Sequence, residues 1–272
     1  MKSKLQSPLL VSIFLILYTL NTSAQDRVFN YTYQSNILNK GVKEIEVWTS
    51  VNTGKKDYFR EIENRVEYEI GLGSNLQMSF YLNSKQKAFF DNISGEIVMD
   101  PTEISISNEW KYKFSDPVAN KIGFAGYGEI TVATDELEIE LKAIFDKKIG
   151  NTLHALNLVF EHESETTTVE GKMKTNQAIK YDVNYGASYT LSNKWNLGGE
   201  LLYRNIYANV DRSVQSAIFA GPCIEYHVDN FWINLSYSPQ IAGLRNLEGV
   251  KGLNVDEFTK NNFRILFSYW FN

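Results

Sequence analysis

The stretch FREIENRVEYEIGL, residues 59–72, separates apolar from charged side chains with a period of two. One parity holds Ile62, Val66, Tyr68, Ile70 and Leu72, and the other holds Glu61, Glu63, Arg65, Glu67 and Glu69. A helix would distribute both sets around its circumference, whereas a strand places each set on its own face. The stretch therefore predicts a β-strand with one apolar face and one charged face.

The same alternation recurs along the chain, for example in LEIELKAIF (137–145) and AIKYDVNYGASYTL (178–191). It predicts twelve strands, at residues 43–52, 59–73, 75–83, 102–115, 121–133, 136–147, 151–163, 177–191, 194–206, 213–228, 230–239 and 261–271. Most of these segments are longer than the usual soluble strand of about five or six residues. Their length is typical of the tilted strands of a transmembrane β-barrel.

The predicted connections alternate between short and long. Short links follow the second, fourth, sixth, eighth and tenth strands, whereas residues 84–101, 164–176, 207–212 and 240–260 form mostly longer links. Outer-membrane barrels have short periplasmic turns and long external loops. The pattern favours an antiparallel barrel with both termini in the periplasm. A soluble β-sandwich would also alternate, but its strands would be shorter.

Residues 1–24 have the features of a cleaved signal peptide. Lys2 and Lys4 precede the apolar run LLVSIFLILYTL (9–20), and small residues precede a cleavage site after Ala24. We therefore expect export to the bacterial outer membrane, with the barrel spanning residues 43–272. Residues 25–42 are expected to form an N-terminal periplasmic segment or an extra strand. The alternating FNYTY (29–33) also allows an N-terminal plug or an extension of the first strand.

The chain ends in FRILFSYWFN (263–272), which resembles the C-terminal signal that the outer-membrane insertion machinery reads. The residues that carry this resemblance are Phe263, Ile265, Phe267, Tyr269 and Phe271. The match departs in its last residue, because Asn272 follows the aromatic side chain. The resemblance implies that this machinery and the outer-membrane lipid are partners of the chain.

Three further stretches resemble a family of uncharacterised bacterial outer-membrane β-barrel proteins. They are EIEVWTS with RVEYEIGLGSNLQMSFYLN, then NEWKYKFSDPVANKIGFAGYGEI, and then FAGPCIEYHVDNFWINLSYSPQI. The resemblance covers most of the chain after the signal peptide. It implies the fold and the location, and it carries no activity and no catalytic residues.

Charged side chains of one parity are expected to line the lumen. The predicted lumen residues are Glu63, Arg65, Glu67, Glu69, Glu129, Glu138, Glu140, Lys142, Asp182, Glu200, Arg204 and Glu225. Two interpretations are open: the charges brace a narrow, filled lumen, or they line a wet pore that favours cations or polar solutes. Passive passage of small hydrophilic or cationic solutes is the working hypothesis, and a structural or adhesive barrel is the alternative.

Other classes of function find little support in the sequence. No phosphate loop, dinucleotide fingerprint or metal-ligand spacing is present, so we expect no cofactor and no metal. The formal net charge of −5 argues against a nucleic-acid partner. An outer-membrane hydrolase is the remaining alternative: it would need His162 or His227 within reach of a nucleophile, and the sequence alone does not show such reach for these residues or for His154. We expect no enzymatic activity, and the oligomeric state is open.

Overall fold

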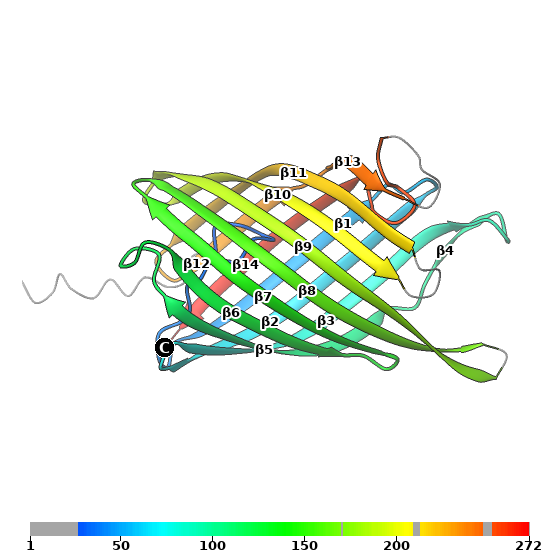
Figure 1. The fold of residues 1–272 in the computed structure, drawn as a ribbon, viewed down its shortest axis with the longest axis horizontal. Helices are drawn as coiled ribbons and strands as arrows, with labels where there is room; N and C mark the ends of the chain where they lie inside the picture. The colour runs from blue at the N-terminus through cyan, green and yellow to red at the C-terminus, as the bar shows by residue number, and fades with distance from the viewer. Residues whose placement is uncertain (1–26, 170, 209–212, 247–251, 272) are drawn as a thin grey trace, which may run out of the picture.

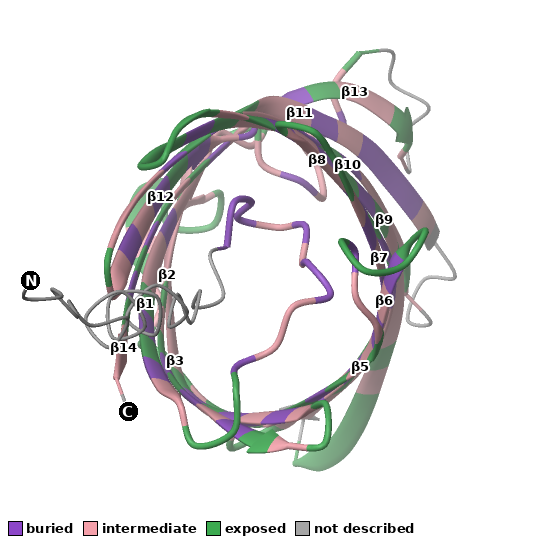
Figure 2. Cartoon of the chain, turned by 90° about the vertical axis from the view of Figure 1, so that its left-hand side faces the viewer, coloured by how far each residue is buried: buried purple, intermediate pink, exposed green. Residues whose placement is uncertain are grey.

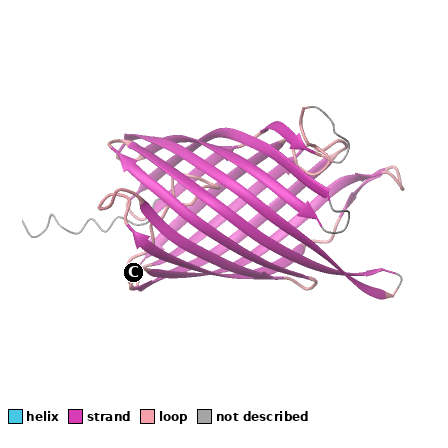
Figure 3. Ribbon diagram, in the orientation of Figure 1, coloured by secondary structure: helices cyan, strands magenta, loops and turns pink. Residues whose placement is uncertain are grey.

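The structure, a computed structural model, describes residues 27–169, 171–208, 213–246 and 252–271. The predicted signal peptide, residues 1–24, lies outside the described residues. Strands dominate the described chain, as Figure 3 shows. Within the described residues, no helix is long and apolar enough to cross a membrane.

The described residues form fourteen strands joined into one antiparallel sheet. They are β1 (Lys43–Thr53), β2 (Phe59–Gly73), β3 (Leu76–Asp91), β4 (Glu96–Met99), β5 (Glu103–Ser115), β6 (Gly123–Val132), β7 (Glu136–Ile149), β8 (Thr152–Val169), β9 (Lys172–Ser192), β10 (Trp195–Ala208), β11 (Ser213–Val228), β12 (Phe231–Tyr237), β13 (Gln240–Arg245) and β14 (Asn261–Phe271).

The sheet closes on itself, as Figure 1 shows. Strand β1 pairs with β14, and β10 pairs with β11, so no edge of the wall is left unpaired. Strands β12 and β13 pair with successive parts of β11 and share one position in the wall, while β4 pairs only with β3. Fourteen strands therefore occupy twelve positions, and the predicted barrel of about twelve strands is confirmed.

The barrel has two different ends. We call the end where β1 begins and β14 finishes the terminal end, and the opposite end the distal end. Turns at the terminal end, such as Ser74–Asn75, are mostly short. At the distal end two hairpins, β3–β4 and β8–β9, project beyond the wall (Figure 1).

These hairpins correct two predicted loops. Residues 84–101 contain the end of β3 and all of β4, and residues 164–176 contain the paired ends of β8 and β9. Residues 240–260, the third long link, include β13. The pairing continues although the apolar alternation stops, for example at Thr167 opposite Lys174. Outside a bilayer both faces of a hairpin meet water, so a strand there needs no apolar face.

The outer face of the wall is apolar. Val47, Val66, Leu82, Ile106 and Val132 are opposite one another in register across five neighbouring strands. Each is exposed, with Ile106 the most exposed at 62%. A continuous exposed apolar band of this kind is what lipid chains cover in an outer-membrane barrel.

Candidate functional site

The inner face of the wall carries the charged residues, and they surround a cavity of about 720 Å³ that we call the vestibule. The vestibule extends to the distal end, where its lining includes Lys55, Phe59 and Gln215. Eight of the twelve predicted lumen residues line it: Glu63, Arg65, Glu129, Glu138, Glu140, Lys142, Asp182 and Arg204. The other four, Glu67, Glu69, Glu200 and Glu225, also point inward but are buried nearer the terminal end.

The vestibule lining is balanced in charge. It contains nine acidic residues, namely Glu61, Glu63, Glu129, Glu138, Glu140, Glu161, Glu163, Asp182 and Glu257. It also contains nine basic residues, namely Arg27, Lys55, Arg65, Lys85, Lys87, Lys142, Lys180, Arg204 and Arg264. The inward carboxylates that motivated a cation-favouring lumen therefore have an equal number of basic partners. The lining is polar, and its formal net charge is zero.

Ion pairs link inward side chains within and between strands of this wall. Arg65 of β2 reaches Glu129 of β6 at 3.2 Å, and its Nε donates a hydrogen bond of 2.6 Å to Asn83 of β3. Lys142 lies 2.6 Å from Glu140 on the same strand, and Lys180 of β9 lies 2.6 Å from Glu163 of β8. These pairs are partly or fully removed from solvent, so each cation stabilises carboxylates whose charge would otherwise be costly to bury.

Residues 27–42, which we call the lumen segment, lie inside the barrel. Figure 2 looks along the barrel from the terminal end and shows this segment crossing the opening, with much of it buried. It forms no strand, so the extra-strand interpretation of FNYTY (29–33) is wrong. The segment also does not extend β1, and its position inside the barrel is compatible with a plug, which stays a prediction.

The backbone of the lumen segment bonds to side chains of the wall instead of to a neighbouring strand. Glu200 of β10 accepts hydrogen bonds from the backbone N–H groups of Asn30 (3.1 Å), Tyr31 (2.8 Å) and Thr32 (2.7 Å). Asn157 of β8 both accepts from the N–H of Tyr33 at 2.5 Å and donates to its carbonyl at 2.9 Å. These bonds satisfy backbone groups that a strand ladder would otherwise have to pair.

Two further contacts fix the rest of the segment. Asp146 of β7 accepts from both the backbone N–H and the hydroxyl of Ser35, at 3.0 and 2.6 Å. Gln77 of β3 accepts from the N–H of Leu38 at 2.8 Å. The lumen segment is therefore held at separate points by strands from all around the wall.

Aromatic side chains of the lumen segment meet basic residues of the wall at the base of the vestibule. The guanidinium of Arg264 lies 4.2 Å from the ring centre of Tyr31 and 4.0 Å from that of Trp48. The ammonium of Lys142 lies 4.2 Å from the ring centre of Tyr33. Cation–π contacts at this range are favourable, and they strengthen where water is excluded.

The inward side chains nearer the terminal end leave little room for solvent. Trp232, Asn234 and Leu266 are 0% exposed, and Asn157 is also 0% exposed where it binds the lumen segment. Asn234 donates to the carbonyl of Val28 at 2.6 Å and accepts from the side chain of Asn30 at 2.9 Å. Among the described residues, the cavity thus lies toward the distal end and the fully buried inward side chains lie toward the terminal end.

Several inward-facing residues were not predicted from the sequence. Glu44 and Glu46 of β1 and Glu109 of β5 point inward and are buried. The alternation of EIEV, in which Ile45 and Val47 are exposed on the outer face, carries the signal that could have identified the first two.

The three histidines do not gather at one site. His227 points inward, and its Nδ1 lies 2.8 Å from Glu225 Oε1 at the terminal end. His154 is half-buried, and its Nδ1 lies 2.8 Å from the hydroxyl oxygen of Tyr185. His162 lies on the same parity of β8 as His154, near the distal end.

The C-terminal residues that resemble an assembly signal all lie on β14. Phe263, Ile265, Phe267 and Tyr269 belong to its outer face and are exposed. Phe271 shares their parity and lies opposite Lys43 of β1. Their role in assembly stays a prediction.

A family model matches residues 21–271. The chain belongs to this family, the family of unknown function DUF6662. None of the curated proteins matches it.

Solved structures share the barrel of this family member. The β domain of the Bordetella autotransporter BrkA aligns with a TM-score of 0.57 at 9% identity, over 86% of this chain and all of that chain. The KdgM porin, solved with disordered oligogalacturonate, aligns with a TM-score of 0.50 at 11% identity, over 84% and 99%. The translocator domain of NalP from Neisseria meningitidis aligns with a TM-score of 0.50 at 12% identity, over 85% and 88%. Identities this low show the fold alone, which is that of outer-membrane barrels.

Proposed function

We propose that the protein is a pore of the bacterial outer membrane for small hydrophilic solutes, closed by its own lumen segment. With the terminal end of the barrel in the periplasm, the vestibule opens toward the cell exterior. The observation that carries this proposal is that a polar vestibule of about 720 Å³ ends on a segment that is not part of the wall. The segment is attached through side chains such as Glu200, Asn157 and Asp146, so it can leave without breaking any pair of wall strands.

The balanced charge of the vestibule lining indicates which class of solute could pass through it. Nine acidic and nine basic residues give the lining no net sign, which supports small hydrophilic solutes in general over cations alone. Neutral polar solutes and zwitterions fit such a lining because they can bond to both kinds of side chain.

The competing function is a structural or adhesive barrel whose lumen never opens. The burial of Trp232, Asn234 and Leu266 near the terminal end favours it, since these side chains leave no solvent-exposed surface there. The projecting β3–β4 hairpin also favours it, because Ile93 at its tip is 98% exposed and offers an apolar contact to a partner.

Single-channel recording in planar bilayers separates these functions. The full chain should conduct rarely and in small steps, and a variant that lacks residues 27–38 should give larger and more frequent steps. A folded deletion variant that conducts no better than the full chain would establish the closed, structural barrel. Heat-dependent gel mobility, which distinguishes a folded from an unfolded barrel, checks that the deletion variant is folded.

A reversible lock tests the gating role of the lumen segment itself. Ser35→Cys and Asp146→Cys, in a Cys223→Ser background, replace two side chains that are in hydrogen-bond contact. Oxidation should abolish the openings, and a reducing agent should restore them. The single variants Ser35→Cys and Asp146→Cys serve as controls, because neither alone can form the cross-link.

A further inference from the structure

Arg264 of β14 differs from most of the cations that line the vestibule. Seven of the nine basic residues in the lining lie at most 3.9 Å from a carboxylate oxygen, and the exceptions are Lys55 and Arg264. The Nε of Arg264 donates to Ser50 at 2.6 Å, and its Nη1 donates to the carbonyl of Asn30 at 3.4 Å. Its Nη2 has no hydrogen-bond partner among the described residues. Part of this half-buried guanidinium is therefore available to a ligand.

A second donor without a partner lies two residues away on the same face of β14. The side chain of Asn262 lines the vestibule and is 2% exposed. Its Oδ1 accepts from the hydroxyl of Thr259 at 2.6 Å, whereas its Nδ2 has no hydrogen-bond partner in the described part of the chain. Buried polar atoms normally have partners. An unsatisfied amide beside a guanidinium without a carboxylate indicates a place for an anionic group.

Glu63 of β2 is the opposite case, a carboxylate that lacks a cation. It is half-buried and lines the vestibule. Among the described residues, its side chain forms no ion pair and accepts one hydrogen bond, from the uncharged amide of Asn52 at 3.4 Å. Charged groups that are partly removed from water are normally paired. This carboxylate therefore offers a place for a cationic group.

The strand register holds Arg264 and Glu63 on either side of Ser50. This serine of β1 is directly opposite Arg264 of β14 and directly opposite Glu63 of β2. The backbones of β14 and β2 are therefore about 10 Å apart at this level, which is two strand spacings. The guanidinium of Arg264 is also held between the rings of Tyr31 and Trp48, at 4.2 and 4.0 Å from their centres. The two opposite charges thus face the vestibule without pairing with each other.

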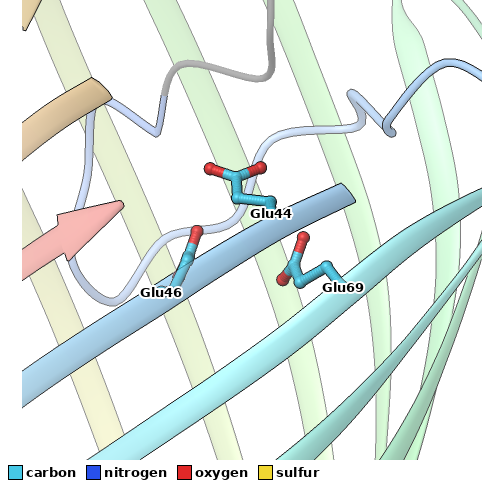
Figure 4. Close-up of side chains that lie close together, drawn as sticks. All are labelled: Glu44, Glu46 and Glu69. Carbon is cyan, nitrogen blue, oxygen red and sulfur yellow. The ribbon is translucent and has the colours of Figure 1, made fainter. Parts of the chain in front are cut away.

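Three inward carboxylates nearer the terminal end differ from Glu63 in their access to solutes. They are Glu44 and Glu46 of β1 and Glu69 of the adjacent β2, which meet on the inner wall in Figure 4. Each is at most 4% exposed, and none of them lines the vestibule. All three have protein partners, such as Arg27 for Glu46 at 3.2 Å. A solute in the vestibule therefore meets Glu63 and not these three.

We propose that Arg264 and Asn262 bind the carboxylate of a zwitterionic solute while Glu63 binds its protonated amine. A carboxylate accepts N–H groups from a guanidinium and an amide, and an ammonium donates to a carboxylate. Amino acids and short peptides carry both groups. The proposal names the class of solute and in this respect rests on the proposed function. The binding itself does not require the lumen segment to leave.

A panel of small solutes tests the proposal on the folded full chain in detergent. Glycine and triglycine are zwitterions of different length, acetate carries only the carboxylate, and methylammonium carries only the amine. Equilibrium dialysis should show that at least one zwitterion binds roughly tenfold or more tightly than acetate and methylammonium do, because it bonds to both charged side chains. The tighter of the two zwitterions shows whether single amino acids or peptides fit between the charges.

Variants assign each end of the solute to a side chain. In Arg264→Gln the zwitterion should bind no more tightly than methylammonium does, and in Glu63→Gln it should bind no more tightly than acetate does. Lys87→Gln and Glu163→Gln are the matched controls, because both residues line the vestibule but belong to ion pairs. Both controls should keep the preference for the zwitterion.

Two results would overturn the proposal. One is a wild-type chain that binds neither zwitterion more tightly than it binds acetate and methylammonium. The other is a preference that survives both Arg264→Gln and Glu63→Gln. Asn262→Asp places a negative charge beside Arg264 and should also abolish acetate binding, so it keeps the test decisive if Arg264→Gln fails to fold in the gel-mobility assay.

The failure of this inference can be told apart from the failure of the proposed function. Dialysis measures binding with the lumen segment in place, whereas the bilayer recordings measure openings. Openings without a preference for zwitterions would overturn the binding site alone. Zwitterion binding in a chain that never conducts would overturn the pore alone.

Discussion

The ring of Phe29 lies directly over Gly186 of β9. A Cβ added at Gly186 would be 2.9 Å from three carbons of this ring, closer than real Cβ atoms approach other atoms. Phe29 is 0% exposed and belongs to an apolar cluster with Val28, Ala155 and Cys223. The wall therefore has a glycine at a point where the lumen segment packs closely against it.

Gly186→Ala should loosen the lumen segment. The added methyl group displaces the Phe29 ring, so the segment leaves its position more often and the openings in planar bilayers become more frequent. Gly128→Ala is the matched control, because a Cβ there would meet only Leu141, at an ordinary 3.6 Å. Equal opening frequencies in the two variants would contradict the role of the segment in closure.

Arg65→Met should destabilise the barrel strongly. Arg65 pairs with Glu129 at 3.2 Å and with Glu67 at 3.7 Å, and its guanidinium lies 4.3 Å from the ring centre of Tyr81. Its loss leaves buried carboxylates without a counter-charge, which costs about 3–5 kcal/mol in the free energy of unfolding. Urea unfolding in detergent micelles measures the change.

The double variant Arg65→Met/Glu129→Gln tests the cause of that loss. Removing the negative charge of Glu129 together with the positive charge should recover part of the stability. The free energies of unfolding of the wild type, both single variants and the double variant are compared. If the losses caused by Arg65→Met and Glu129→Gln simply add in the double variant, the two side chains are not coupled, and the ion pair does not explain the loss in Arg65→Met.

Val66→Arg should destabilise the barrel in lipid vesicles. Val66 lies midway along β2 on the outer face, so the variant places a charge against hydrocarbon, at a cost of roughly 2–4 kcal/mol near the bilayer centre. Ile97→Arg is the control, because Ile97 is also exposed and apolar but lies on the projecting strand β4. Similar unfolding free energies for both variants would place the middle of β2 outside the bilayer.

Phe271→Ala should slow assembly in cells more than it weakens the finished barrel. Phe271 is the last residue of β14 and ends the stretch that resembles an assembly signal. The measurement is the fraction of folded protein in the outer membrane over time, compared with the unfolding of the purified variant. Phe263→Ala, at the other end of the same strand, is the control, and an equal assembly delay would argue against a terminal signal.

The wall was predictable because its two environments differ along every strand. Lipid outside and polar side chains inside force a period of two, and this period placed Glu63, Glu140 and Asp182 on the inner face from the sequence alone. The β8–β9 hairpin was missed beyond residue 163 because water surrounds it and imposes no such period.

The lumen segment could not be placed from the sequence. Its backbone bonds reach residues remote in the chain, such as Glu200 for Thr32, and no local pattern encodes such partners. The alternation of FNYTY indicated a strand, but a strand needs a free neighbour, and the closed wall offers none. The meeting of Glu44 with Glu69 likewise depends on cross-strand register, which the linear sequence does not give.

The pairing of Lys43 with Phe271 has a consequence for the order of events during biogenesis. The ribosome makes β1 early, yet its partner β14 emerges only after nearly all of the intervening polypeptide. Until then one edge of β1 has no strand to pair with, and an unpaired edge can form hydrogen bonds with a strand other than β14. Closure of the barrel is therefore a late step in folding. Chaperones must keep the unfolded chain from mispairing until β14 is available to pair with β1.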